Sequence, residues 1–399
     1  MTKKTPTILM PTMGEGDMPD TQALADKLRA EGWSVIHADF SGDLQTASNK
    51  VDWTQIDIVD TRNMRGSLTN FTTYSAILDE INDQIRKQRR AGRVVTTTLD
   101  DRTIKWLSNK SDYLKKLEDL GVKIIPTTVI SFQKDGIRDN PVSRRSAAEN
   151  IYSKLVSSEC DNWVIKPSTS ALAKGLRFID VDRDTGKIVI TVTEPRQQAA
   201  NDDAHQVTTT YEDKEAFIEA MAEYMRLENT HDGRFLLQEY VDNLETSAVF
   251  INGKAHYVER PTGPSHIAHG NFGGQDIPKP KKDIDPNIIQ FVDYIRSQLP
   301  PEVISAKFLR IDVMQQAGNG LILGEIEGAG AARLWLGEAK GAIKNYTEML
   351  KDMHAANAKA TKTLGRVFET RAGGAGVTIR ADVSRTPTPP NVDRKAANG

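Results

Sequence analysis

Three carboxylates fall in or beside the apolar runs of one segment, residues 310–328, which reads RIDVMQQAGNGLILGEIEG. The segment has the pattern of a β-hairpin, and side chains alternate between the two faces of a strand. Arg310 and Asp312 therefore share one face of their strand, and Glu325 and Glu327 share one face of theirs. Carboxylates that face each other need a counter-cation, or else one of them takes up a proton. The pattern thus predicts a site for a divalent cation.

The turn of the hairpin decides which carboxylates meet. A two-residue loop at positions 318–319 places Asp312 opposite Glu325, and a loop at positions 319–320 places it opposite Glu327. Oxygen ligands without histidine or cysteine favour Mg²⁺ or Mn²⁺, and Mg²⁺ commonly completes its shell with substrate phosphates. The alternative interpretation is that these carboxylates line the solvated face of an edge hairpin.

Two further segments could contact a nucleotide. Lys166 ends the apolar run WVI and precedes PSTSALAKG, a loop of small and hydroxyl residues, so it could meet a phosphate as a point charge. The spacing is not that of a P-loop, and a surface hairpin fits this segment equally well. In LLQEYVDNLETS, Gln238 and Val241 lie at a strand end, and Glu245 follows. A base needs an apolar slot with polar groups at its edge, and a ribose diol needs a carboxylate.

The composition limits the class of protein. The chain has 399 residues, 38% hydrophobic and 27% charged, which predicts a globular protein of two or three domains. A net charge of −2 gives no general attraction to nucleic acid or to anionic membranes. The single cysteine, Cys160, excludes an internal disulfide and a multi-cysteine zinc site. No signal-peptide core and no membrane-length apolar run is present, so we expect a cytoplasmic protein.

The elements that must position these residues change character along the chain. Strands and helices alternate over residues 1–125, which predicts a parallel sheet with helices on both faces, and TIKWLSNKSDYLKKLEDLG reads as one helix. No GxGxxG follows the first strand, so a dinucleotide site is not expected. Residues 126–232 and 233–365 read as α+β regions rich in hairpins, one of them with an Asn-Gly turn at positions 252–253. Residues 370–399 have the composition of a disordered tail.

Five segments, in this order, resemble the ATP-grasp superfamily of carboxylate–amine ligases, typified by D-alanine–D-alanine ligase and glutathione synthetase. They are NKSDYLKKLEDLGVKIIPT, WVIKPSTSALAKG, QEYVDNLETS, RIDV and GEIEG, and they span roughly residues 110–333. Within the superfamily the chain is most similar to the glutathione-synthetase-like group that includes the ureido-serine cyclo-ligase. The resemblance implies a pre-ATP-grasp domain (1–125), a small lid subdomain (126–232) and a C-terminal subdomain with the metal site (233–365). The two α+β subdomains would sandwich ATP.

The resemblance also implies roles for the matching residues. The lysines and the loop at 168–175 would bind the ATP phosphates, the segment around Gln238 would frame adenine, and Glu245 would bind ribose. The three carboxylates would hold two Mg²⁺ ions, or Mn²⁺, between the β- and γ-phosphates. The implied nucleotide contacts are Lys110, Lys166, Ser168, Ser170, Gly175, Gln238, Glu239, Val241 and Glu245, and the implied metal ligands are Asp312, Glu325 and Glu327.

The same resemblance implies ADP-forming amide or peptide bond formation through an acyl phosphate. Arg310 is the candidate for contacting the transferred phosphoryl group, and Arg260 in VERPTG the candidate for contacting the carboxylate substrate. The alternative for Arg260 is a surface arginine at a strand end. His266 and His269 have no third ligand nearby and are expected to belong to a substrate loop rather than to a metal site. The substrate candidates are Arg62, Arg65, His266, His269 and Arg333.

Two features depart from the family pattern. Many relatives have asparagine where Glu327 stands, which makes this site one charge more negative, and GAGAARLW replaces a segment that often contains proline. The acceptor pocket is therefore undefined by sequence. The expected partners are a small carboxylate and an amine, such as amino acids or short peptides, with no nucleic acid or membrane. A small-molecule kinase and a catalytically silent nucleotide-binding regulator are the alternative functions, and a homodimer is not distinguished from a monomer.

Overall fold

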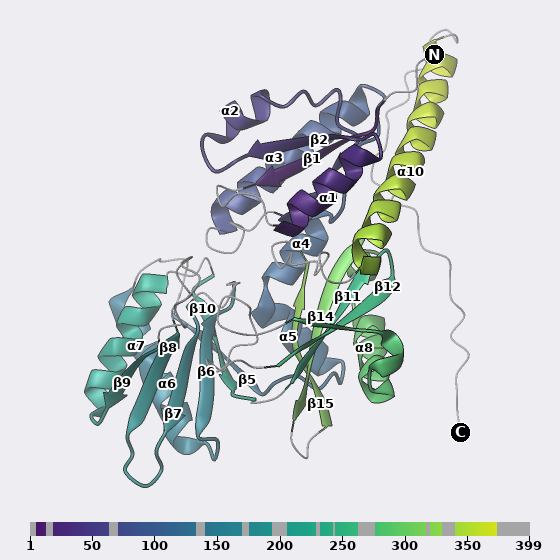
Figure 1. Cartoon of the computed structure of the whole chain (residues 1–399). Coiled ribbons are helices and arrows are strands. Elements are labelled where there is room, and N and C mark those ends of the chain that lie inside the picture. Colours follow the sequence, from purple (N-terminus) through teal and green to yellow (C-terminus); the bar gives the residue numbers. More distant parts are fainter. Residues whose placement is uncertain are drawn as a thin grey trace.

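The computed structural model describes residues 5–12, 19–63, 71–132, 140–169, 175–193, 206–228, 232–241, 244–261, 276–316, 320–328 and 340–372. Three sheets, each with helices packed on it, make up this part of the chain (Figure 1). The first sheet is parallel and the other two are antiparallel. This mixed α/β architecture is the one that the sequence predicts.

The N-terminal sheet has four parallel strands in the order β2-β1-β3-β4, which confirms the predicted parallel sheet. The third and fourth strands are shorter than the apolar runs that predict them, because only two residues of each pair with a neighbour. The strands are β1 (Thr7–Thr12), β2 (Ser34–Asp39), β3 (Ile58–Val59) and β4 (Thr96–Thr97), and the helices are α1 (Pro19–Ala30), α2 (Leu44–Asn49), η1 (Thr61–Asn63), α3 (Phe71–Arg90) and α4 (Asp101–Ser108).

The middle sheet has six antiparallel strands in the order β5-β10-β6-β7-β8-β9, and we call it the lid sheet. Helices α6 (Pro141–Ser157) and α7 (Lys214–Glu228) pack on it through a shared apolar core. Strand β10 lies between β5 and β6, whereas the predicted boundary at 232/233 assigns that strand to the C-terminal subdomain. The strands are β5 (Thr127–Ser131), β6 (Asn162–Pro167), β7 (Arg177–Val181), β8 (Ile188–Thr193), β9 (Gln206–Tyr211) and β10 (Arg234–Glu239).

The C-terminal sheet has five strands in the order β13-β12-β11-β14-β15. Asn252 and Gly253 have φ values of 49° and 80°, as the predicted Asn-Gly turn between β11 and β12 requires. Apolar residues of α5 and α8 cover one face of this sheet. The other face, which we call the polar face, carries charged side chains and also Val249, Val258 and Phe308, which belong to the core shared with the N-terminal sheet. The elements are α5 (Lys110–Asp119), β11 (Glu245–Ile251), β12 (Lys254–Arg260), β13 (Ile277–Lys279), η4 (Lys281–Asp283), α8 (Pro286–Gln298), α9 (Pro301–Ile304), β14 (Phe308–Gln316) and β15 (Gly320–Glu327).

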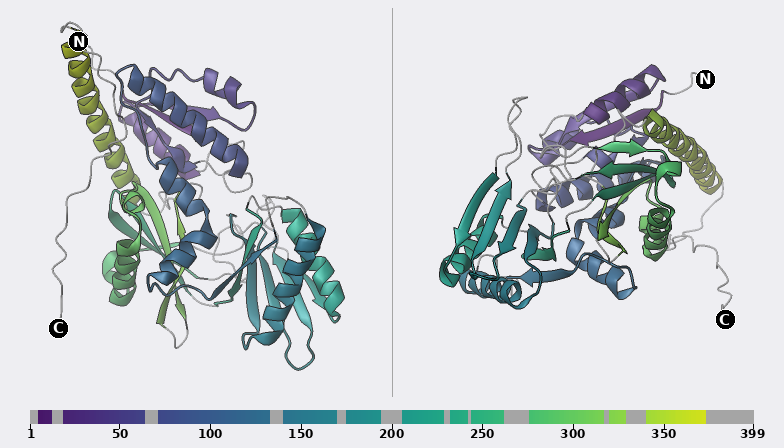
Figure 2. Two further views of the ribbon diagram at one scale, coloured as in Figure 1. Left: turned by 180° about the vertical axis from the view of Figure 1, so that it is seen from behind. Right: turned by 60° about the horizontal axis from the view of Figure 1, so that its bottom comes forward.

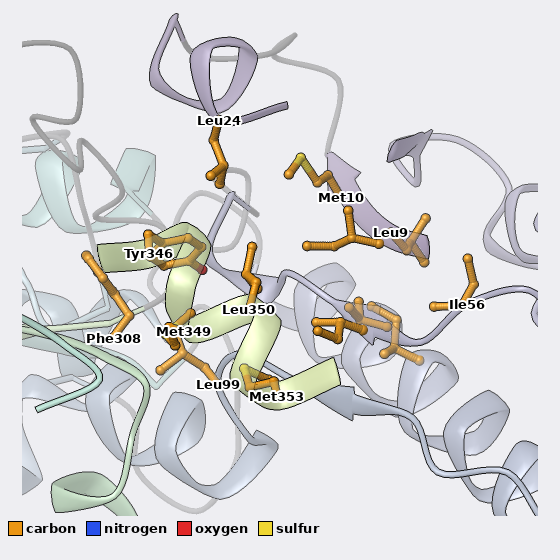
Figure 3. Packing of buried hydrophobic residues seen from close by; sticks show 14 of the residues in the cluster. Leu9, Met10, Leu24, Ile56, Leu99, Phe308, Tyr346, Met349, Leu350 and Met353 are labelled. Carbon is orange, nitrogen blue, oxygen red and sulfur yellow. The ribbon is translucent and has the colours of Figure 1, made fainter. Parts of the chain in front are cut away.

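A long final helix, α10 (Lys340–Ala372), joins the N-terminal and C-terminal sheets (Figures 1 and 2). Its residues Tyr346, Met349, Leu350 and Met353 are buried in a core that also contains Leu9 of β1 (Figure 3). The helix includes residues 370–372, the start of the segment predicted to be a disordered tail, and residues 373–399 lie outside the described part.

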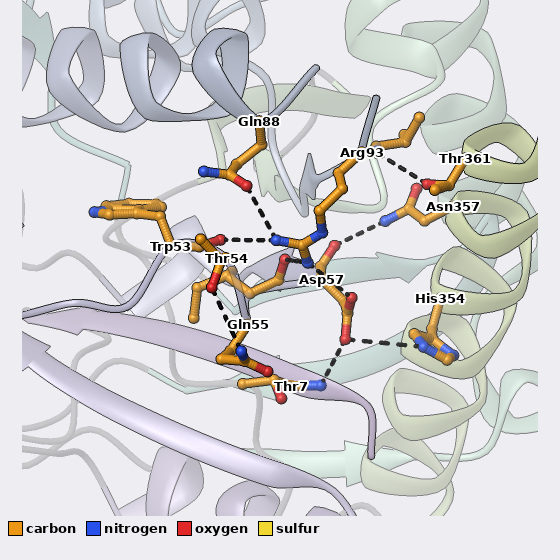
Figure 4. A network of polar contacts seen from close by, with 12 residues as sticks. Thr7, Trp53, Thr54, Gln55, Asp57, Gln88, Arg93, His354, Asn357 and Thr361 are labelled. Carbon is orange, nitrogen blue, oxygen red and sulfur yellow. Dashed lines mark hydrogen bonds and ion pairs between the residues drawn. The ribbon is translucent and has the colours of Figure 1, made fainter. Parts of the chain in front are cut away.

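A polar network fixes the same helix further along its length (Figure 4). Arg93 donates to the backbone oxygen of Ile56 at 2.9 Å, and Asn357 donates to the backbone oxygen of Asp57 at 2.8 Å. The hydroxyl of Thr361 accepts from the backbone of Val94 at 2.9 Å. Together with the apolar contacts, the bonds made by Asn357 and Thr361 hold α10 against the N-terminal domain. Among the helices within the described ranges, none is long and apolar enough to cross a membrane.

Candidate active site

The carboxylates of the 310–328 segment gather on the polar face of the C-terminal sheet. Asp312 lies opposite Glu325, and Arg310 lies opposite Glu327. Nearer the turn, Gln316 lies opposite Gly320, and the register shifts by one residue between Asp312 and Val313. Without this shift Asp312 would lie opposite Gly324, which has no side-chain carboxylate. The pairing of Asp312 with Glu325 therefore depends on a bulge as well as on the turn.

Each of these carboxylates has a cationic partner. The Nε and Nη2 atoms of Arg310 donate to Asp312 at 2.8 and 2.7 Å, and the same guanidinium pairs with Glu327. Lys110 pairs with Glu325. Within the ranges that the structure describes, no group of three or more His, Cys, Asp or Glu is arranged to hold a metal ion by itself. The donor chemistry fits Mg²⁺, but a bound ion would have to replace these cations.

Lys110 reaches this face because the predicted single helix is broken at Asn109. The Oδ1 atom of Asn109 accepts from the backbone of Asp112 at 3.2 Å and from the hydroxyl of Ser111 at 2.9 Å. This N-cap ends α4 and makes Lys110 the first residue of α5. The Tyr113 hydroxyl accepts from the backbone N–H of Ile326 at 3.1 Å and ties α5 to β15. Lys110 is only 6% exposed as a result.

Lys166 approaches from the lid sheet, where it lies opposite Leu236 of β10. Burial lowers the pKa of Lys166, Glu325 opposes that effect, and the neighbouring charge of Lys110 adds to it. Val164 lies two residues earlier on the same strand face and packs with Phe178 and other apolar side chains. The lid sheet therefore offers a lysine whose charged form is disfavoured mainly by burial, beside an apolar surface.

The two ends of the 168–175 loop are anchored. The fully buried Ser168 hydroxyl lies 2.7 Å from each carboxylate oxygen of Asp232. Gly175 has a φ of 74°, and a Cβ there would come within 2.9 Å of Pro167. Ser168 thus fixes the start of the loop, and its contact with a phosphate stays a prediction. Ser170 lies outside the described residues.

The segment expected to frame a base lies at the end of β10. The side-chain amide of Gln238 donates to the hydroxyl of Thr127 at 2.8 Å, and the Glu239 backbone N–H is bonded to Pro126 at 3.2 Å. Val241 packs with Ile125, Ile322 and Met314. The segment therefore supplies an apolar surface, while these two polar groups are already used within the protein.

Glu245 and Arg260 lie opposite each other at the end of the same sheet face. Arg260 pairs with Glu245, and its Nε donates to Asp276 at 3.1 Å. Burial raises the pKa of Glu245, and Arg260 opposes that rise. Since Arg260 is only 6% exposed, the alternative of a surface arginine is wrong.

Some side chains of this site were not predicted. Ser247 donates to Asp312 at 2.7 Å, and it lies two residues after Glu245, so strand alternation could have placed it on this face. Asp276 pairs with Arg260, which lies 16 positions earlier in the sequence, and no local sequence pattern predicts this contact.

Arg62 requires a correction. We expected it to meet a substrate, but it is fully buried, 3.6 Å from Asp60 and stacked 5.1 Å from the Tyr346 ring centroid. Asp60 also accepts from the Tyr346 hydroxyl at 2.8 Å. Arg62 therefore helps to dock α10. The other substrate candidates, Arg65, His266, His269 and Arg333, lie outside the described residues.

Two neighbouring glutamates titrate in opposite directions. Burial raises the pKa of Glu327 to about 7, although Arg310 opposes it. Burial would also raise the pKa of Glu325, but the charges of Lys110 and Lys166 outweigh it and lower that pKa to about 2. At neutral pH Glu325 is therefore ionised, and the pKa of Glu327 lies much closer to neutrality.

The raised pKa of Glu327 predicts a pH-dependent stability. Between its ordinary value of 4.5 and about 7, the folded protein holds a proton that the unfolded chain has lost. The free energy of unfolding should therefore fall as pH rises through this window, by on the order of 1 kcal/mol per pH unit at most. We expect Glu327→Gln to remove this component, measured by urea denaturation from about pH 5 to about pH 8. Exposed Glu348→Gln is the control, and identical pH slopes for Glu327→Gln and wild type would contradict the assignment.

Comparison with known proteins agrees with this architecture. No family model and no curated protein matches the sequence. A D-cycloserine synthetase superposes with a TM-score of 0.60 at 17% identity, covering 87% of this chain and 99% of that one. A D-alanine–D-alanine ligase from Bacillus anthracis complexed with ATP gives 0.51 at 11% identity, covering 91% and 99%. A RimK domain ATP-grasp protein from Sphaerobacter thermophilus gives 0.50 at 10% identity, covering 85% and 98%. The chain therefore has the ATP-grasp fold.

Proposed function

We propose that the protein is an ATP-dependent carboxylate–amine ligase that acts on amino acids or small peptides. The observation that carries the proposal is that two lysines from different elements act on one carboxylate: Lys110 pairs with Glu325, and the charge of Lys166 also lowers the pKa of Glu325. A triphosphate is the ligand that such lysines suit, and carboxylates beside it suit its metal ions. The structural neighbours, one named as a synthetase and one as a ligase, support the same function.

The charges in the site suggest how the nucleotide is accepted. Without it, Glu325 neutralises Lys110, and Asp312 and Glu327 share Arg310. With ATP bound, Lys110 and Lys166 would pair with its phosphates, and Asp312, Glu325 and Glu327 would be the residues that hold Mg²⁺. Bound Mg²⁺ would supply neutralisation of phosphate charge. Arg310 would then give up part of its pairing with these carboxylates and would stabilise the transferred phosphoryl group.

The proposed chemistry has two steps. A carboxylate oxygen of one substrate attacks the γ-phosphorus of ATP, the bond from that phosphorus to the β-bridging oxygen breaks, and an acyl phosphate and ADP form. The amine nitrogen of the second substrate then attacks the acyl carbon, and the bond to phosphate breaks. The N–H proton leaves with the phosphate as HPO₄²⁻. The residues of this chain bind and orient the reactants, and the mutual repulsion of carboxylate and triphosphate is the barrier that they lower.

A trapping assay tests this function. The protein is incubated with ATP, Mg²⁺ and pools of amino acids, with hydroxylamine as a general amine, and ADP and hydroxamates are measured. We expect ADP release together with a hydroxamate, and a condensed product when an amino-acid amide replaces hydroxylamine. A stable phosphorylated product that does not react with the amine would favour a kinase. Binding of ATP without any ADP release would favour a silent nucleotide-binding protein.

A further inference from the structure

A chain of polar contacts connects the two lysines along the side of the site. The Nη1 atom of Arg234 on β10 donates to Asp112 at 2.7 Å and to the Ser111 hydroxyl at 3.1 Å, both in the first turn of α5. That turn begins with Lys110. The side chain of Arg234 therefore joins the lid sheet to the helix that presents one of the two lysines.

The backbone of Arg234 completes the connection to the other lysine. The Ser168 backbone N–H donates to the Arg234 carbonyl at 3.1 Å, and the Arg234 N–H donates to Asp232 at 3.1 Å. Asp232 also accepts the Ser168 hydroxyl at 2.7 Å. Ser168 follows Lys166 by two residues. Arg234 therefore contacts both the start of α5, through its side chain, and the end of β6, through its backbone.

This connection, which we call the brace, has a physical purpose. Lys110 and Lys166 carry like charges, and the charge of Lys110 lowers the pKa of Lys166. Two cations that are held close together repel each other until an anion binds between them. Lys110 lies on α5, which packs on the C-terminal sheet, whereas Lys166 lies on β6 of the lid sheet. A tie between those elements limits their separation, so that less ordering is left to be done when ATP binds.

We infer that Arg234 is a positioning residue which sets the spacing of Lys110 and Lys166 and so raises the affinity for ATP. The inference rests on the proposed nucleotide site. Arg234 acts through Asp112 and touches no reacting group. The side chains of Arg234 and Asp112 are 37% and 63% exposed, so the expected effect is modest.

Equilibrium binding of ATP with Mg²⁺ tests the inference. Arg234→Gln should weaken ATP binding by up to about fivefold, the upper limit for an exposed ion pair. Asp112→Asn should weaken it by a similar factor, and the double variant should be no weaker than either single one. The matched control is Arg226→Gln, which breaks the exposed Arg226–Glu223 pair on α7 and should leave ATP affinity unchanged.

Four results would overturn the inference or the nucleotide site on which it rests, and they can be told apart. If Arg234→Gln binds ATP as tightly as Arg226→Gln, Arg234 does not position the lysines. If the two single effects add in the double variant, the residues act independently and the brace is wrong. Failure of the wild-type protein to bind ATP would overturn the proposed nucleotide site itself. A lower melting temperature with unchanged ATP affinity would show a structural role alone and would also overturn the inference.

Discussion

Glu325→Gln should abolish ATP-dependent turnover while the protein remains folded. Glutamine keeps the shape of the side chain and can still accept a hydrogen bond from Lys110, but it removes the charge that Mg²⁺ requires. Metal neutralisation of phosphate supplies several kcal/mol to the transition state, so we expect a loss on the order of 10³-fold in kcat/KM. The weakened bond to Lys110 should cost about 1.5–3 kcal/mol of folding stability.

Binding measurements separate the metal role from a general loss of structure. In the wild-type protein, Mg²⁺ should tighten ATP binding, and in Glu325→Gln that gain should largely disappear. Glu259→Gln is the control, because Glu259 pairs with Lys279 at 2.8 Å on the same sheet but points to its other face. Turnover of Glu325→Gln within tenfold of the wild type would place the metal ions elsewhere.

The predicted elements depend on local patterns, and these were sufficient for most of the fold. Alternation of apolar residues marks β14 and β15, and the Asn-Gly pair at 252–253 marks the β11–β12 turn. The break at Asn109 was missed because the helical periodicity continues through it, and only the cap geometry separates α4 from α5. The helix α10 was not predicted, although Tyr346, Met349, Leu350 and Met353 have helical spacing.

The site was predictable in its residue types but not in its pairings. Strand alternation places Asp312 and Arg310 on one face, yet the partner of Asp312 depends on the bulge at Gly324. Asp276 and Arg234 contact residues far away in sequence, so no local pattern could assign them. Arg62 was misassigned because an arginine after a strand suggests an exposed ligand contact, whereas Asp60 and Tyr346 together make its burial acceptable.

Lys166→Met should weaken ATP binding without weakening the fold. A charge-assisted contact of lysine with phosphate contributes about 1.5–3 kcal/mol, which corresponds to roughly a 10- to 150-fold rise in Kd. Methionine keeps the apolar stem and removes a half-buried cation whose pKa is already lowered by burial and by Lys110. The free energy of unfolding should therefore stay the same or rise.

That separation of affinity from stability is the informative part of the experiment. Isothermal titration with ATP and Mg²⁺ gives Kd, and urea denaturation gives the free energy of unfolding. Lys187→Met is the matched control, since Lys187 precedes β8 of the same sheet and pairs with exposed Glu212. If the Lys166→Met variant binds ATP as tightly as the control, Lys166 does not contact the nucleotide. Lys110 and Lys166 would then not form a phosphate-binding site, and the proposal that this protein is a ligase would lose its main support.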